Sequence, residues 1–128
     1  MKVNVYLRFN GRALEAMTFY TKVFETDFVG PVLVDPDTNH LINACLDLGG
    51  LLMSASDVDE KVSNRFSSIS LVAAFDSQEK AKSIFSQLAE DGEVILPFSL
   101  QDWGDECGHV IDRFGISWDI LVPGEMNY

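Results

Sequence analysis

The order of apolar and polar residues in the first half of the chain predicts a strand, a helix and three more strands. Residues 3–9 alternate between apolar and polar positions, as a half-buried strand does. After the Asn10-Gly11 break, apolar residues recur at the spacing of one helix face: Ala13, Ala16, Met17, Tyr20, Val23 and Phe24. Three further strands are predicted at 28–34, where Gly30-Pro31 indicates an edge strand or a bulge, at 40–48, and at 51–56 after a Gly49-Gly50 hairpin turn.

The second half of the chain repeats this order. A strand is predicted at 69–75, and Asp76 with Glu79 has the form of a capping box that begins the next helix. Apolar residues then share one face of that helix until Gly92 ends it: Ala81, Ile84, Phe85, Leu88 and Ala89. The remaining strands are predicted at 93–100, 107–112 and 116–122.

Two offsets relate the halves to each other. An offset of 66 residues carries 3–9 onto 69–75, and an offset of 65 carries the D-x-x-G turn at 47–50 onto the one at 112–115. One duplication of this length indicates two pseudo-symmetric modules. We therefore expect a single domain over residues 1–128, with module one at 1–57, a polar linker at 58–66 and module two at 67–128.

Four strands and one helix in each half predict an α+β fold built from two β-α-β-β-β modules. One such module buries its own sheet poorly, so we expect two curled sheets that close a cleft between them. A ferredoxin-like sandwich also combines strands with two helices. Three consecutive strands after each helix argue against that alternative.

The charge of the chain limits the classes of partner. The net charge is −11, in a chain that is 47% hydrophobic. Such an acidic surface repels phosphate backbones and anionic lipids, so we predict no nucleic-acid partner and no membrane partner. It would steer cations toward the protein. The simpler interpretation is that the charge keeps the protein in solution.

The cysteines and the N-terminal pattern indicate the cytoplasm. Cys45 and Cys107 form no CxxC pair and are too few for a disulfide framework, so we expect free thiols in a reducing compartment. The alternation after Met1-Lys2 does not resemble the apolar core of a secretory signal, so we expect none. No apolar run reaches the roughly 20 residues that span a bilayer.

Two motifs carry a resemblance to a known family. The first is Phe9-Asn10-Gly11 followed by Glu15-Ala16, Phe19-Tyr20 and Val23-Phe24, and the second is Trp103, Gly108, Asp112-Arg113-Phe114-Gly115 and Trp118. Together they resemble the PhnB-like branch of the vicinal oxygen chelate superfamily, which also contains glyoxalase I, extradiol dioxygenases, fosfomycin-resistance enzymes and bleomycin-resistance proteins. The resemblance covers essentially the whole chain and implies paired β-α-β-β-β modules, usually in a homodimer.

The resemblance also implies where a metal would be held. In metal-dependent members, the first and fourth strands of each module each give one ligand, commonly His or Glu. Those positions fall here on Asn4, Ser54, Ser70 and Asp119, and the offsets of 66 and 65 pair them across the repeat. A catalytic metal needs about three imidazole, thiolate or carboxylate ligands, and only Asp119 qualifies. We therefore predict no metal and no other cofactor.

The remaining candidate residues leave alternatives open. His40 and His109 lie near predicted strand starts, where a surface role competes with that of a general base. Neither cysteine lies at a helix start or beside basic residues, so nothing indicates a nucleophile. The acidic clusters at 57–60 and 102–106 lack the spacing of a calcium loop and are interpreted as solvated segments.

Three aromatic or charged residues are candidates for the lining of the predicted cleft. Asp119 interrupts an apolar strand and points either into the cleft or to the outer face. Trp118 is either core or cleft, and Trp103, in a predicted loop, contacts either a ligand or a partner or neither. The predicted cleft positions are Asn4, Ser54, Ser70, Trp103, Trp118 and Asp119.

The sequence thus predicts a homodimeric, metal-free protein that binds a small molecule. By resemblance to the bleomycin-resistance members, and from the charge and the indoles, a cationic aromatic ligand is one hypothesis. The alternative is a metal-dependent lyase, transferase or dioxygenase, for which Asp119 is the sole supporting residue. A third hypothesis is a structural or regulatory partner protein whose cleft is filled by its own side chains.

Overall fold

The computed structural model describes residues 1–59 and 68–124. The chain divides into two compact units, Met1–Val62 and Ser63–Tyr128, which are called module one and module two below. Most of the linker predicted at 58–66 lies outside the described residues. The cleft predicted between the two sheets stays a prediction.

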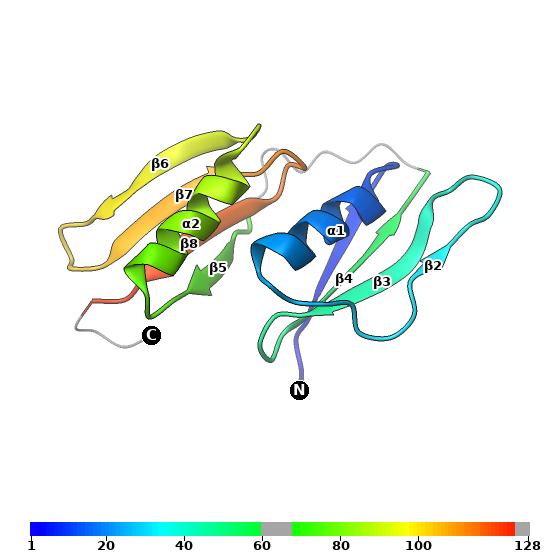
Figure 1. Ribbon diagram of the computed structural model, residues 1–128, viewed down its shortest axis with the longest axis horizontal. Helices are drawn as coiled ribbons and strands as arrows, with labels where there is room; N and C mark the ends of the chain where they lie inside the picture. Colours follow the sequence, from blue (N-terminus) through cyan, green and yellow to red (C-terminus); the bar gives the residue numbers. More distant parts are fainter. Residues whose placement is uncertain (60–67, 125–128) are drawn as a thin grey trace. The chain divides into compact units, whose positions relative to one another are not determined.

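Module one has one helix on a four-stranded sheet (Figure 1). Its strands pair in the order β1-β4-β3-β2, with β1 parallel to β4 and the other pairs antiparallel. The elements are β1 Val5–Phe9, α1 Ala13–Val23, β2 Leu33–Val34, β3 Leu41–Asp47 and β4 Leu52–Asp57.

Module two has the same connectivity, with the strand order β5-β8-β7-β6 and β5 parallel to β8. Its elements are β5 Leu71–Ala74, α2 Gln78–Ala89, β6 Glu93–Leu100, β7 Glu106–Ile111 and β8 Ser117–Val122. The predicted α+β fold of two β-α-β-β-β modules is therefore confirmed.

The strand registers refine the repeat. Val5 pairs with Met53 in module one and Leu71 pairs with Trp118 in module two, which reproduces the offsets of 66 and 65. The third strands, however, differ by 64 residues, because Cys45 pairs with Ser54 whereas His109 pairs with Asp119. The alignment of 47–50 on 112–115 is thus wrong by one residue: the extra residue lies in the turn between β7 and β8.

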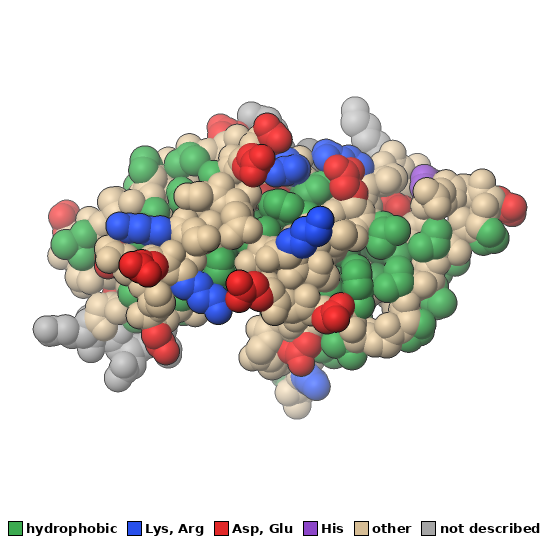
Figure 2. Space-filling view, viewed as in Figure 1, with side chains coloured by type: hydrophobic (Ala, Val, Ile, Leu, Met, Phe, Trp, Pro, Cys, Tyr) green, Lys and Arg blue, Asp and Glu red, His purple; other side chains and the backbone are tan. Residues whose placement is uncertain are grey.

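One face of each sheet is covered by the helix of its own module (Figure 1). In module two, Ile84 and Leu88 of α2 are buried together with Val110, Trp118 and Ile120 of the sheet. Gly108 permits this packing, since a Cβ atom there would lie 2.6 Å from the Phe85 ring. Figure 2 shows basic and acidic side chains intermixed in the same view as Figure 1. Neither helix, at 11 and 12 residues, could span a membrane, and no other helix in the described ranges could.

Two local predictions fail for identifiable reasons. Of the strand predicted at 28–34, only Leu33–Val34 forms a strand, because Gly30 takes a positive φ of 74° before Pro31. Helix α2 is capped by Ser77, whose hydroxyl accepts a hydrogen bond from the Lys80 amide at 3.2 Å, and not by Asp76. In α1, where Arg12 gives no side-chain cap, the Asp57 carboxylate accepts hydrogen bonds from the amides of Gly11 and Ala13.

Candidate functional site

The face of the module-two sheet opposite α2 gathers polar side chains from its strands. Side chains alternate along a strand, so Trp118 and Ile120 point toward α2 and Asp119 points away from it. The register places His109 and Val72 on either side of Asp119. We call this surface the helix-free face of module two and define it by six residues: Ser70, Val72, Cys107, His109, Ser117 and Asp119.

A chain of hydrogen bonds crosses this face. The His109 ring nitrogen Nε2 lies 2.7 Å from the Ser117 hydroxyl oxygen, and the Ser117 hydroxyl donates to the Ser70 hydroxyl oxygen at 3.1 Å. In the arrangement in which the Ser117 hydroxyl donates to Ser70, the His109 tautomer that donates its Nε2 proton to Ser117 keeps Nδ1 as an acceptor. Ser117 is only 7% exposed, so the middle of the chain is held away from solvent.

Asp119 places a negative charge beside this chain. Its side chain is half-buried, and no Lys or Arg of the described residues forms an ion pair with it. The pKa of the neighbouring Cys107 thiol is raised, first by burial and then by the negative charges of Asp119 and Asp105. Cys107 is therefore a protonated, weakly reactive thiol near neutral pH.

The corresponding face of module one has different chemistry. The Tyr6 hydroxyl donates to the Ser56 hydroxyl oxygen at 2.9 Å, and the Arg8 guanidinium lies 5.2 Å from the centre of the Tyr6 ring. In the register, Ser54 on β4 lies between Tyr6 on β1 and Cys45 on β3. This surface, the helix-free face of module one, consists of Tyr6, Arg8, Cys45, Ser54 and Ser56, and it carries an aromatic ring and a positive charge.

The residues at the family's metal positions do not fit a metal. Asn4 precedes β1, and its side-chain oxygen accepts a hydrogen bond from the Leu52 amide at 3.1 Å. Ser54 and Ser70 offer neutral hydroxyls, and that of Ser70 is bonded to Ser117. Asp119 alone is a firm ligand. Among residues 1–59 and 68–124, no three His, Cys, Asp or Glu side chains converge.

The two tryptophans have separate positions. Trp118 is 2% exposed and donates from Nε1 to the Asp112 carboxylate at 2.9 Å, so the cleft position predicted for it is corrected to a core position under α2. Trp103 is 61% exposed in the turn between β6 and β7, with Nε1 bonded to Asp105 at 3.1 Å. A ligand contact by Trp103 stays a prediction.

The histidines also differ. His40 precedes β3 in module one, where its amide is bonded to the Thr38 hydroxyl. His109 is the fourth residue of β7, beside Asp119, and not a strand-end residue as the sequence indicated. His109 was named as a possible general base but not among the cleft positions. An offset of 65 would align it with Ala44, which faces the core, whereas the observed offset of 64 aligns it with Cys45 on the helix-free face.

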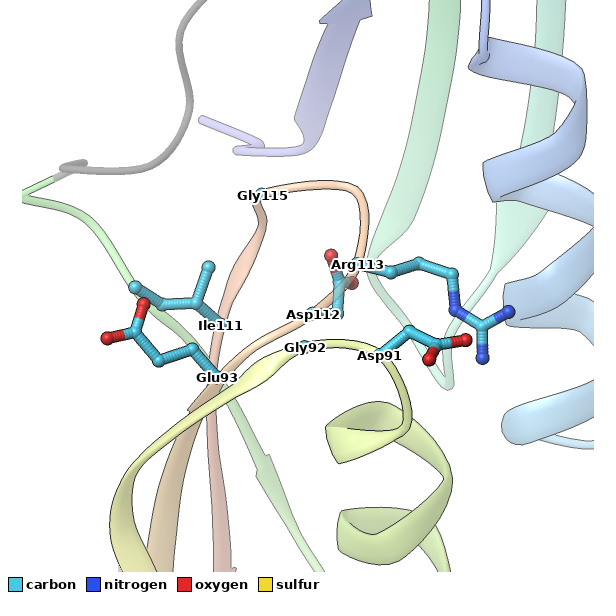
Figure 3. A pocket seen from close by; sticks show the side chains of 7 residues that line it. All are labelled: Asp91, Gly92, Glu93, Ile111, Asp112, Arg113 and Gly115. Atoms are coloured by element: carbon cyan, nitrogen blue, oxygen red, sulfur yellow. The ribbon is translucent and has the colours of Figure 1, made fainter.

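A pocket of about 380 Å³ lies at the end of the module-two sheet (Figure 3). It is lined by Asp91, Gly92, Glu93, Ile111, Asp112, Arg113 and Gly115. The Glu93 and Ile111 side chains lie side by side, away from those of Asp91 and Arg113 (Figure 3). Ile111 follows His109 by two residues in β7, so the pocket borders the helix-free face. Asp112 serves the fold, because its carboxylate accepts hydrogen bonds from the Phe114 and Ile116 amides.

These paired modules define a class of protein. A glyoxalase-related enzyme from Fulvimarina pelagi has the same fold, with a TM-score of 0.70 at 16% identity over 100% of this chain and 99% of that one. The fold is that of the vicinal oxygen chelate superfamily. Within it, the family model described as 3-demethylubiquinone-9 3-methyltransferase matches residues 1–121, and this chain belongs to that family.

Two relatives support the assignment to the PhnB-like branch. Protein YjdN of Escherichia coli is 23% identical over 95% of this chain and 95% of its own length. The structure of a Bacillus cereus protein, described as a putative 3-demethylubiquinone-9 3-methyltransferase and PhnB protein, has a TM-score of 0.82 at 26% identity, covering 96% of this chain and 100% of that one. The predicted resemblance is therefore confirmed.

Proposed function

We propose that this chain is a small-molecule-binding protein that acts without a catalytic metal and receives its ligand on the helix-free face of module two. One observation carries this proposal: a half-buried Asp119 lies beside a bonded His109–Ser117–Ser70 chain, on a sheet face that α2 does not cover. Ser117 is buried and bonded at the centre of this face, so the polar groups beside Asp119 are held in one arrangement. Asn4, Ser54 and Trp103 are proposed as further contact positions.

The proposed ligand is a small aromatic cation. Asp119 supplies a carboxylate without a described cationic partner, and Val72, which is 63% exposed, supplies apolar surface beside it. The net charge of −11 favours approach of a cation over approach of an anion. An exposed Trp103 ring is available for a cation–π contact.

Calorimetric titration with benzyltrimethylammonium and with benzoate tests this proposal. The wild-type protein should bind the cation more tightly, and Asp119→Asn should weaken that binding by about 1–3 kcal/mol if the contact is desolvated and by less than about 1 kcal/mol if it is exposed. Asp102→Asn, an exposed carboxylate in the β6–β7 turn, is the matched control and should change little. Binding of benzoate alone would contradict the proposed polarity.

The alternative function is that of a metal-dependent lyase, transferase or dioxygenase, and only Asp119 supports it. Elemental analysis of the dialysed protein distinguishes the metal-free binding protein from the metal-dependent enzyme. We expect no stoichiometric zinc, nickel, iron or manganese, because Asn4 and Ser70 are already engaged in hydrogen bonds and hydroxyls are weak ligands. One metal ion per chain that survives dialysis would replace the binding proposal with the enzymatic one.

We also propose that the two modules act as one domain and that the protein is a cytoplasmic homodimer. The described cysteines, Cys45 and Cys107, are both free thiols, as a reducing compartment favours. Strand β6 is an edge strand, and Val94, Ile95 and Leu100 on it are exposed. Exposed apolar side chains on an edge strand are suited to contact with a second copy.

A further inference from the structure

We propose that His109 is a general acid–base residue and that the molecule bound at the helix-free face of module two is a substrate with a weakly acidic C–H or O–H bond. This inference rests on the proposed function, because the substrate must first bind at that face. It adds a reaction to what is otherwise a binding site.

The geometry around His109 suits a proton acceptor. Its Nε2 lies 2.7 Å from the Ser117 hydroxyl oxygen, which fixes the orientation of the ring. In the tautomer that donates from Nε2 to Ser117, Nδ1 is the basic nitrogen. Ser117 is itself fixed, because it is buried and bonded to Ser70. A base held in this way loses little freedom when a substrate binds, which is what proton transfer in a site requires.

The hydrogen-bond chain also provides a route for the proton. As Nδ1 takes a proton from the substrate, the Nε2 proton passes to Ser117, the Ser117 hydroxyl proton passes to Ser70, and the Ser70 hydroxyl proton passes to water. The imidazole ends neutral with its tautomer exchanged, and the substrate keeps the electron pair of the broken bond. No oxidant, reductant or metal takes part. Ser70 is half-buried, so its hydroxyl marks the end of the route nearest to solvent.

The charges that surround His109 favour this step. The titratable side chains on its face are Asp119 on β8, Cys107 on β7 and Glu93 on β6, while β5 contributes none and α2 covers the opposite face. Asp119 is directly opposite His109 in the ladder, and its negative charge stabilises the positive charge that develops on the ring during the proton transfer. Cys107 stays a neutral thiol because burial and the charge of Asp119 raise its pKa.

The test uses 5-nitrobenzisoxazole, a neutral aromatic probe with one acidic C–H bond. Removal of that proton forms a nitrile while the N–O bond breaks, and the electrons move to oxygen to give a coloured phenolate. The wild-type protein should release the phenolate faster than buffer. His109→Gln should lower the protein's rate by about 10²-fold. His40→Gln is the matched control and should leave the rate unchanged.

Ser117→Ala tests the positioning role of the serine. Without the hydroxyl, the ¹⁵N shifts of the His109 ring should move from the Nε2-protonated form toward a mixture of tautomers, and the pH profile should move with them. A substitution that only loosened the fold would not change the tautomer of one ring. Unchanged ring shifts and an unchanged pH profile would reject the relay.

The two proposals fail separately. A wild-type rate equal to that of His109→Gln overturns the acid–base role, whatever the binding data show. If benzyltrimethylammonium still binds and Asp119→Asn still weakens it, the binding function survives that result. If the cation does not bind either, both proposals are rejected.

Discussion

At the scale of single residues, neighbours along β8 have opposite surroundings. Trp118 packs under α2 and bonds to Asp112, while Asp119 points to the helix-free face beside His109. The alternation of a strand dictates that these two side chains face opposite ways. Both were predicted to line the cleft, and adjacent residues of one strand cannot both do so; burial assigns Trp118 to the core and Asp119 to the helix-free face.

The nearness of Asp119 to Cys107 can be tested by thiol labelling. Asp119 contributes to the raised pKa of Cys107, so Asp119→Asn should lower that pKa and increase the thiolate fraction at pH 8. In a Cys45→Ser background, labelling by neutral iodoacetamide should become about two- to tenfold faster. The pKa should stay above the ordinary value, because burial is the larger cause and remains.

Two comparisons make that labelling experiment specific. Asp102→Asn, which removes an exposed carboxylate from the same module, should leave the labelling rate near that of the parent. The rate of the parent should rise with pH through the raised pKa of the thiol. An Asp119→Asn protein that labels no faster than the Asp102→Asn protein would show that the two side chains do not share a face.

At the scale of elements, the hydrophobic pattern predicted both helices and most strands, because an apolar face has a clear period in each. It did not predict the helix ends. Asp76 and Glu79 have the spacing of a capping box, yet the hydroxyl of Ser77 bonds to the Lys80 amide. For α1 the cap comes from Asp57, which is far away in sequence, and a local pattern cannot reveal such a partner.

The cap of α2 gives a direct comparison of two adjacent residues. Ser77→Ala removes the acceptor of the Lys80 amide and should lower the free energy of unfolding by about 1 kcal/mol. Asp76→Ala should cost less, because Asp76 gives no cap hydrogen bond in the structure. Urea denaturation of both variants measures the difference. A larger decrease in the free energy of unfolding for Asp76→Ala than for Ser77→Ala would support the capping box that the sequence indicated.

At the scale of the whole molecule, the repeat predicted the fold, because order of elements and length survive where sequence identity between the halves is low. Family membership followed from two motifs at the two ends of the chain. The candidate site was only partly predictable: Asp119, Ser70 and Ser54 were named in advance. Ser117 was not named, and His109 was named without its place beside Asp119, since pairing across strands, and not proximity in sequence, brings these residues together.

The proposed homodimer is tested by light scattering. We expect the mass of two chains at micromolar concentration, with a buried area on the order of 1,500 Å² or more in total. Replacing the exposed Leu100 of β6 by Lys should shift the protein toward the monomer mass if this edge lies in the interface. A monomer mass for the wild-type protein would reject the dimer.

The measurement that tests the central claim most directly is NMR titration of the ¹⁵N-labelled protein with benzyltrimethylammonium. Binding at the helix-free face of module two should shift the amide signals of Val72, His109 and Asp119 in a saturable manner, while signals from the outer surface of α2 stay in place. The same titration of Asp119→Asn should need a higher concentration of the cation. Saturable shifts confined to α2, or no saturable shift in the wild-type protein, would contradict the claim that this face is a ligand site.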